Sequence, residues 1–96
     1  MMNDILINNV RDWGYDKGIL RDNLEPHELH DLRKAQAQKT LEEVNELFDA
    51  VEAGDRAEAK DAIGDIIVTL IMQAELWDTG IGSCLLGAYD VIRKRK

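Results

Sequence analysis

The chain lacks the features that stabilise secreted proteins or anchor proteins in membranes. It contains one cysteine, Cys84, and one proline, Pro26. A single cysteine excludes a disulfide within the chain and fits a reducing compartment, so we expect a cytoplasmic protein. No basic segment followed by an apolar one opens the sequence, so no signal peptide is expected. The longest strongly apolar run, 66–72, is far too short to cross a bilayer.

Aromatic and basic residues are also scarce. Aromatic residues make up 5% of the 96, and 12 basic residues face 19 acidic ones, for a net charge of −7. The negative charge argues against binding to nucleic acid or to an anionic membrane surface. The core must be aliphatic, and a chain this short is near the lower size limit for a self-sufficient core. We therefore expect a homodimer or a homotetramer.

The distribution of apolar residues predicts an all-α fold. No alternating strand pattern bounded by turns occurs, and apolar residues at helical spacing predict one domain, 1–96, with helices at about 4–17, 27–53, 56–78 and 83–96. Pro26 suits a first helical turn, Gly54 a helix end and Asp55 an N-cap. No helix-ending signal precedes Lys96, so the sequence leaves open whether the natural chain continues beyond this residue.

Two of these helices carry informative apolar patterns. The second helix carries one apolar stripe, which is expected to face the core. Its residues repeat at spacings of three and four: Ala37, Leu41, Val44, Phe48 and Val51. The third helix is apolar on two sides. Its second side carries Val68 and Met72 together with Asp61 and Asp65. In a chain this short, we expect that second side to meet another subunit.

The most informative feature is a pair of acidic clusters on the second and third helices. The first contains Glu42, Glu43 and Glu46, and the second contains Asp61 and Asp65. Antiparallel helices would bring the clusters face to face, and like charges at such spacing repel each other. A solvated acidic face explains either cluster alone. The two together favour a site for a hard cation, Mg²⁺ or Mn²⁺, which carboxylate oxygens bind well.

Other catalytic patterns are missing. His27 and His30 are three residues apart and do not form the zinc-protease motif, so we interpret them as surface residues. The glycines form no phosphate-binding loop followed by Lys and Ser or Thr. The sequence contains no credible Ser-His-Asp or Cys-His arrangement.

The two clusters resemble the motifs of a known family. Leu41-Glu42-Glu43-Val44-Asn45-Glu46-Leu47, followed by Ile63-Gly64-Asp65-Ile66-Ile67, resembles the MazG-like all-α nucleoside triphosphate pyrophosphohydrolases. That family pairs Glu-Glu-x-x-Glu on one helix with Glu-x-x-Asp on the next. The step of 19 residues from Glu46 to Asp65 fits its helix-turn-helix. The resemblance covers roughly residues 35–96 and implies a four-helix bundle completed by oligomerisation.

The sequence departs from the family at one position. The glutamate of Glu-x-x-Asp should stand three residues before Asp65, where this chain has Ala62. Asp61 is one residue earlier and offers a shorter side chain to the same metal. Glu58 is the other candidate, in a register shifted by one turn. We favour Asp61, and the number of bound metals stays open.

The resemblance implies hydrolysis of a (d)NTP to the (d)NMP and pyrophosphate with Mg²⁺, or Mn²⁺ in its place. The implied metal ligands are Glu43, Glu46, Asp61 and Asp65. Glu42, or one of the ligands Glu43 and Glu46, would orient or deprotonate the attacking water. The implied substrate-binding residues are Lys39, Asp90, Arg93, Lys94 and Arg95 for the phosphates and Trp13 for the base.

Two other functions remain open. The same helices would also suit a noncatalytic regulatory module that binds a nucleotide or a protein, and the alanine at position 62 keeps that alternative open. The second alternative is a structural dimer with solvated acidic faces.

Overall fold

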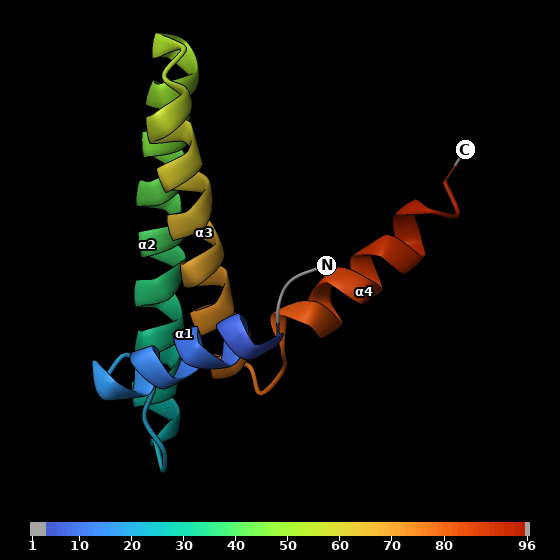
Figure 1. Ribbon diagram of the computed structural model, residues 1–96. Helices are drawn as coiled ribbons and strands as arrows, with labels where there is room; N and C mark the ends of the chain where they lie inside the picture. The colour runs from blue at the N-terminus through green and yellow to red at the C-terminus, as the bar shows by residue number, and fades with distance from the viewer. Residues whose placement is uncertain (1–3, 96) are drawn as a thin grey trace.

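The computed structural model describes residues 4–95, and this part of the chain folds into four helices without a strand (Figure 1). The helices are α1 (Asp4–Asp16), α2 (Pro26–Ala53), α3 (Arg56–Leu76) and α4 (Ile81–Ile92). The all-α prediction is confirmed. α3 ends two residues before its predicted end, just ahead of Asp78, whose backbone is left-handed. α4 begins two residues early and ends at Ile92, and the predicted final residue, Lys96, lies outside the described part.

Local signals explain why α2 and α3 form a helical hairpin. The Glu25 backbone N–H donates to the Glu28 carboxylate in a capping box, and Pro26 occupies the first turn of α2. Gly54 then ends α2 in the left-handed conformation, with φ of 65°. Asp55 caps α3 by accepting a hydrogen bond from the Glu58 N–H at 3.1 Å. The short reversal makes the two helices antiparallel neighbours.

Small and polar side chains form the contact between α2 and α3. Ala50 and Ala62 are buried, and the Thr40 hydroxyl donates to the Thr69 hydroxyl at 2.7 Å. Near the open end of the hairpin, the Gln73 side-chain amide donates to the Arg33 carbonyl oxygen at 2.9 Å. Short side chains let the two helices approach closely, so residues on their facing sides lie within reach of one another.

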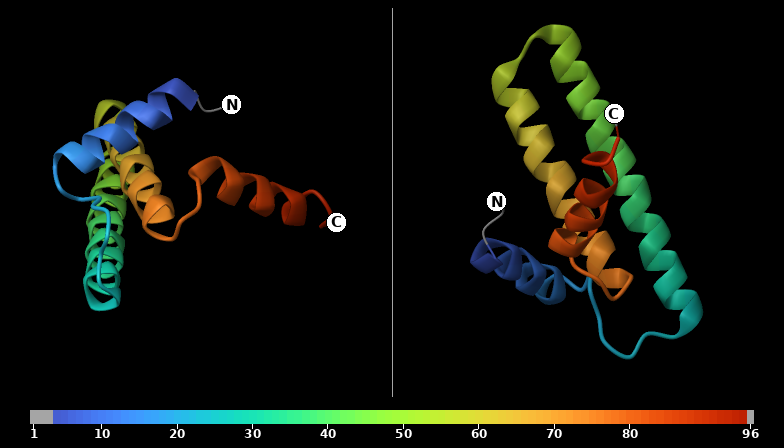
Figure 2. Two further views of the ribbon diagram at one scale, coloured as in Figure 1. Left: turned by 90° about the horizontal axis from the view of Figure 1, so that it is seen from below. Right: turned by 90° about the vertical axis from the view of Figure 1, so that its right-hand side faces the viewer.

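α1 crosses one face of this hairpin, as Figure 2 shows from two directions. Gly14 lies against α3 so closely that a Cβ there would clash with the Met72 sulfur. Met72, only 1% exposed, forms the core with Leu20, Ile71 and Leu76. The side of α3 that carries Met72 is therefore covered by α1 of the same chain. For Met72, the expectation that another subunit covers this side is wrong, because sequence periodicity does not show where a separate helix packs. Asp61 and Asp65 on the same side stay exposed within one chain.

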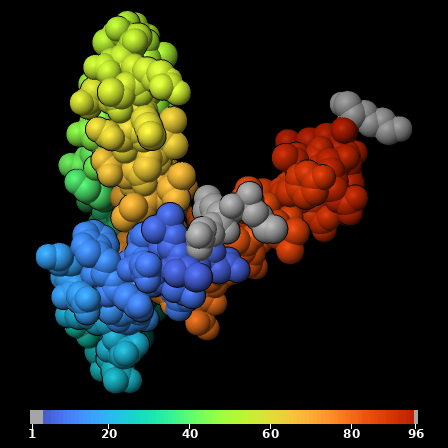
Figure 3. Space-filling view, viewed as in Figure 1, coloured from blue at the N-terminus to red at the C-terminus, as the bar shows by residue number. Residues whose placement is uncertain are grey.

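α4 leaves the rest of the chain as an arm (Figures 1 and 3). None of its residues is buried. The α2 stripe that was expected to face the core is also exposed within one chain, with Phe48 64% accessible. Glu43 and Ala50, not this stripe, are the buried positions of α2. No helix in the described part of the chain is both long enough and apolar enough to cross a membrane.

Replacing Met72 by alanine should lower the free energy of unfolding by about 2–5 kcal/mol, because it leaves a cavity between α1 and α3. Leu70→Ala is the matched control. Leu70 is partly exposed on the other side of α3, so the change should cost less than half as much. Urea denaturation followed by circular dichroism measures both. Equal losses would contradict the packing of α1 on Met72.

Candidate metal centre

Three carboxylates converge where α2 passes α3. Glu43 and Glu46 come from successive turns of α2, and Asp65 comes from α3. One oxygen of each lies within 4.8 Å of the others. Glu43 is buried, whereas Glu46 and Asp65 are exposed. The helical hairpin thus brings together residues that are 19 positions apart in the chain.

Glu43 is the residue most in need of a partner. It is 7% exposed, and its Oε1 lies 3.4 Å from the Lys39 ammonium group. Its other oxygen, Oε2, is buried and has no hydrogen-bond partner among the described residues. A buried carboxylate oxygen without a partner is costly. A bound cation would satisfy it, and three convergent carboxylates suit a hard ion such as Mg²⁺ or Mn²⁺.

The charges of the cluster affect one another. The pKa of Glu46 is raised, first because its protonated carboxyl group can donate a hydrogen bond to Glu43, then by the negative charge of Glu43, with a smaller effect from Asp65. The pKa of Lys39 is also raised, first by its hydrogen bond with Glu43 and then by the charges of Glu43 and Glu42. Both shifts have the same cause, a concentration of negative charge that Lys39 only partly neutralises.

A cavity of about 530 Å³ opens beside the cluster. Glu43, Asp65, Glu42 and Lys39 form its polar wall. Its other lining residues come from α1, α2, α3 and the α1–α2 connection: Trp13, Ile19, Ala35, Gln36, Gln38, Val68, Thr69 and Met72. A cavity whose wall is partly apolar and partly charged suits a ligand that has a flat apolar part and an anionic part.

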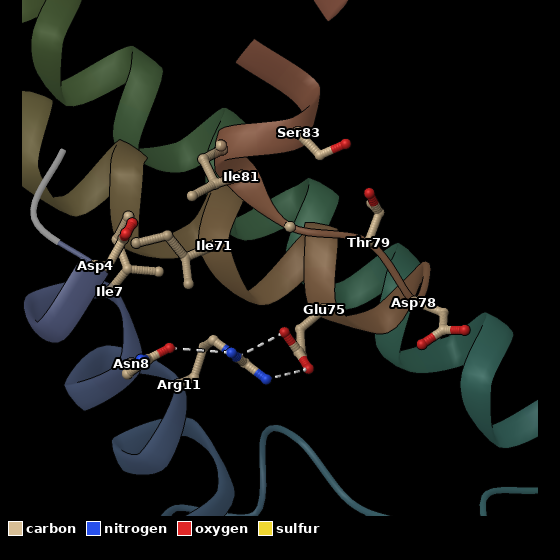
Figure 4. Close-up of a pocket in the computed structure, with 12 residues that line it drawn as sticks. Asp4, Ile7, Asn8, Arg11, Ile71, Glu75, Asp78, Thr79, Ile81 and Ser83 are labelled. Atoms are coloured by element: carbon tan, nitrogen blue, oxygen red, sulfur yellow. Dashed lines mark hydrogen bonds and ion pairs between the residues drawn. The ribbon is translucent and has the colours of Figure 1, made fainter. Parts of the chain in front are cut away.

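A cavity of similar size, about 560 Å³, lies at the base of α4 (Figure 4). Its most polar feature is the ion pair between Arg11 and Glu75, at 2.7 Å. That pair neutralises both charges, and no group of metal-binding side chains occurs there among the described residues. The cavity beside Glu43 is therefore the better candidate site, although it is slightly smaller.

The structure separates the candidates for the fourth metal ligand from the cluster. Asp61 is exposed one turn before Asp65 and is not part of the convergent group. Glu58 lies further away, in the first turn of α3. Ala62, at the position of the family's glutamate, is buried between the helices.

The predicted phosphate-binding residues fall into two sets. Lys39 borders the cavity, as does Trp13, the predicted base-stacking residue. Asp90, Arg93, Lys94 and Arg95 do not line it, because they belong to α4 and the residues just after it. The Arg93 guanidinium donates to the Asp90 carboxylate at 2.9 Å. Within one chain, these four residues stay apart from the acidic cluster.

Several residues that line the cavity had no predicted role in the site, among them Gln38, Val68 and Met72. A signal for Gln38 was available, because it precedes Glu42 by four residues and so shares its side of α2. Ile19 carried no such signal. It follows the end of α1 and reaches the cavity only because α1 crosses the hairpin.

The raised pKa of Glu46 predicts a pH effect on the metal-free protein. The folded state holds this proton more tightly than the unfolded chain, so the contribution of Glu46 to stability is present at low pH. It is lost as the pH rises from about 4.5 through the raised pKa. Urea denaturation in chelator measures the free energy of unfolding between pH 4 and 7. As the pH rises, this free energy should decline less for Glu46→Gln than for the unchanged protein. Glu52→Gln, an exposed change on α2, should leave the decline unaltered.

Comparison with known proteins identifies the family of the chain. The family model for the MazG nucleotide pyrophosphohydrolase domain matches residues 33–87, more than half of the chain. No curated protein and no solved structure matches the chain. The matched segment contains Glu43, Glu46 and Asp65. The chain therefore belongs to the family of MazG nucleotide pyrophosphohydrolase domains.

Proposed function

We propose that the protein is an Mg²⁺-dependent nucleotide pyrophosphohydrolase, which cleaves a (d)NTP to the (d)NMP and pyrophosphate. The observation that carries the proposal is the buried Glu43 oxygen, which has no hydrogen-bond partner within residues 4–95 and lies beside Glu46 and Asp65 at the edge of a cavity. Membership of the family supports the reaction class.

Glu43, Glu46 and Asp65 would hold the ion, with Mn²⁺ as the alternative to Mg²⁺. Asp61 is our candidate for a fourth ligand and Glu58 the second choice. Both are exposed and can change rotamer without disturbing the core. A divalent ion at this position would offset the negative charge of the cluster and of the substrate's phosphates.

The remaining groups of the cavity fit the other steps of the hydrolysis. Water attacks phosphorus, the bond between the α-phosphorus and its bridging oxygen breaks, and pyrophosphate leaves with the bridging oxygen. Glu42 borders the cavity as a free carboxylate and can orient the water and accept its proton, with Glu43 or Glu46 as alternatives. Lys39 borders the cavity and supplies positive charge for the phosphates.

The apolar wall suits the nucleobase. Trp13 is 43% exposed and borders the same cavity as Glu43 and Asp65. We propose that its indole ring stacks on the base, while the polar wall holds the phosphates.

Asp90, Arg93, Lys94 and Arg95 would contribute only from a second copy of the chain. A homodimer or a homotetramer is therefore part of the proposal, as is a cytoplasmic location, which agrees with the free thiol of Cys84.

One observation favours a second function. Ala62 replaces the family's glutamate and is buried, so the cluster has three convergent carboxylates and not four. A noncatalytic module that binds nucleotides without hydrolysing them would retain the cavity and lack turnover. Product analysis separates the two functions.

Replacing Glu43 by glutamine should weaken Mg²⁺ or Mn²⁺ binding by more than roughly tenfold, since even residues outside the ligand shell are worth about 10–100-fold in metal affinity. Isothermal titration calorimetry measures the loss, with Asp31→Asn on the exposed part of α2 as the control. At a metal concentration 100 times the Kd, the control should gain about 2.7 kcal/mol in unfolding free energy. Unchanged binding by the Glu43 variant would place the metal elsewhere.

Incubation with a mixture of NTPs and dNTPs should yield monophosphates and pyrophosphate with Mg²⁺, and neither product in chelator. Asp65→Asn should lower the rate on the order of a hundredfold or more, because loss of the ion removes several kcal/mol of charge stabilisation. It should leave the fold intact or more stable, because it removes one of the crowded charges. Chromatography of the products measures the rate. Nucleotides left intact by a folded, metal-loaded sample would favour the binding module.

A further inference from the structure

Lys39 and Glu43 form an ion pair at the edge of the candidate metal centre. They stand four residues apart on α2, which places both on one side of the helix. The Lys39 ammonium nitrogen lies 3.4 Å from Glu43 Oε1, whereas charge-assisted hydrogen bonds are usually about 2.7–2.9 Å long. Within residues 4–95, Lys39 forms no other ion pair. A single long contact therefore joins the two residues.

The two ends of this ion pair have different surroundings. The Glu43 side chain is 9% exposed, and the Lys39 side chain is 55% exposed. Glu43 contributes an oxygen to the convergent group with Glu46 and Asp65, so a cation bound there needs the carboxylate that Lys39 contacts. An ammonium group and a divalent ion on the same carboxylate repel each other. The ion and the ammonium group therefore compete for Glu43.

The Lys39 side chain can leave Glu43 without disturbing the core. It has a flexible stem of four carbons, lies largely in solvent and borders the cavity of about 530 Å³. Rotation about its side-chain bonds would carry the ammonium group into that cavity. Arg11 offers a contrast, because two of its nitrogens contact Glu75 at 2.7 and 3.0 Å. Arg11 is a fixed partner, whereas Lys39 can exchange one anion for another.

We propose that Lys39 is a replaceable counterion. In the metal-free protein it pairs with Glu43. When a divalent ion takes that carboxylate, the ammonium group turns into the cavity and binds phosphate oxygens of the substrate. The metal thus releases the group that the phosphates need, so metal and polyphosphate should raise each other's affinity. This inference rests on the metal site of the proposed function but not on turnover.

Removing the ammonium group should tighten metal binding, which is the opposite of the effect of losing a ligand. Lys39→Met keeps most of the stem and removes the charge, so Mn²⁺ should bind about fivefold more tightly, at the upper end of what an exposed ion pair contributes. Isothermal titration calorimetry in chelator-free buffer measures the Kd. Lys39→Arg keeps the charge and should bind Mn²⁺ as the unchanged protein does.

Lys60→Met is the matched control. Lys60 borders a cavity together with Asp61 and Asp65 but forms no ion pair within residues 4–95. Its loss changes the net charge equally, and salt screens its exposed charge, so the Mn²⁺ affinity should change less than about twofold. Unchanged or weaker binding by Lys39→Met, or an equal gain from Lys60→Met, would overturn the proposal. Circular dichroism confirms that the variants stay folded, which the exposure of both lysines favours.

Tripolyphosphate tests the second half of the proposal, since it carries the phosphates of every candidate substrate and no base. In saturating Mg²⁺, Lys39→Met should bind it roughly tenfold more weakly than the unchanged protein, because a charge-assisted contact is lost. In chelator, the two proteins should bind it equally weakly, because Glu43 holds the ammonium group. An equal loss of affinity in both conditions would show that Lys39 reaches the phosphates without the metal, and would overturn the proposal.

The assay of hydrolysis separates this proposal from the proposed function. Tighter Mn²⁺ binding by Lys39→Met, in a protein that hydrolyses no nucleotide, would support the role of Lys39 and refute the hydrolase. Metal-dependent hydrolysis by a protein whose Mn²⁺ affinity does not respond to Lys39→Met would support the hydrolase and refute the role of Lys39.

Discussion

The antiparallel contact between α2 and α3 is the interaction on which the rest of the molecule depends. Ala50, Ala62 and the Thr40–Thr69 hydrogen bond let the two helices approach closely. That approach buries Glu43 and brings its carboxylate within 4.8 Å of Asp65. α1 then packs on the hairpin through Met72, and the cavity forms between α1 and the acidic side of the hairpin. If α2 and α3 were further apart, the three carboxylates would separate and the core around Met72 would lose its packing.

The same contact makes the metal-free protein less stable than its packing alone would allow. Helices that meet through alanine and threonine leave Glu43 with one buried oxygen that has no hydrogen-bond partner in the part of the chain that the structure describes. The pKa of Glu46 is raised because Glu43 lies so near. Lys39 relieves part of this charge from the solvent side of α2. A divalent ion would relieve the remainder, so we expect ligand binding and folding stability to be coupled at this site.

The molecule is two-sided. On one side, α1 covers α3 and frames the cavity, so the residues that line the cavity all come from one chain. On the other side, the apolar residues of α2 and α3 face outward and α4 stands apart. The basic residues after α4, which family resemblance associates with phosphates, therefore reach an acidic cluster only if another copy supplies them.

The sequence by itself determined the four helices, because Pro26, Gly54 and Asp55 are local signals that act within one turn of the chain. It also determined the acidic clusters, since Glu43 and Glu46 share a helix edge by spacing alone. Which apolar stripe is buried was decided only by the tertiary structure. Periodicity identifies the apolar side of a helix but not its partner, so it assigned the Phe48 stripe to the core and Met72 to another subunit. The choice of Asp65 over Asp61 in the convergent group, and the outward direction of α4, depend on the closeness of the helix contact and on how Ile81 packs.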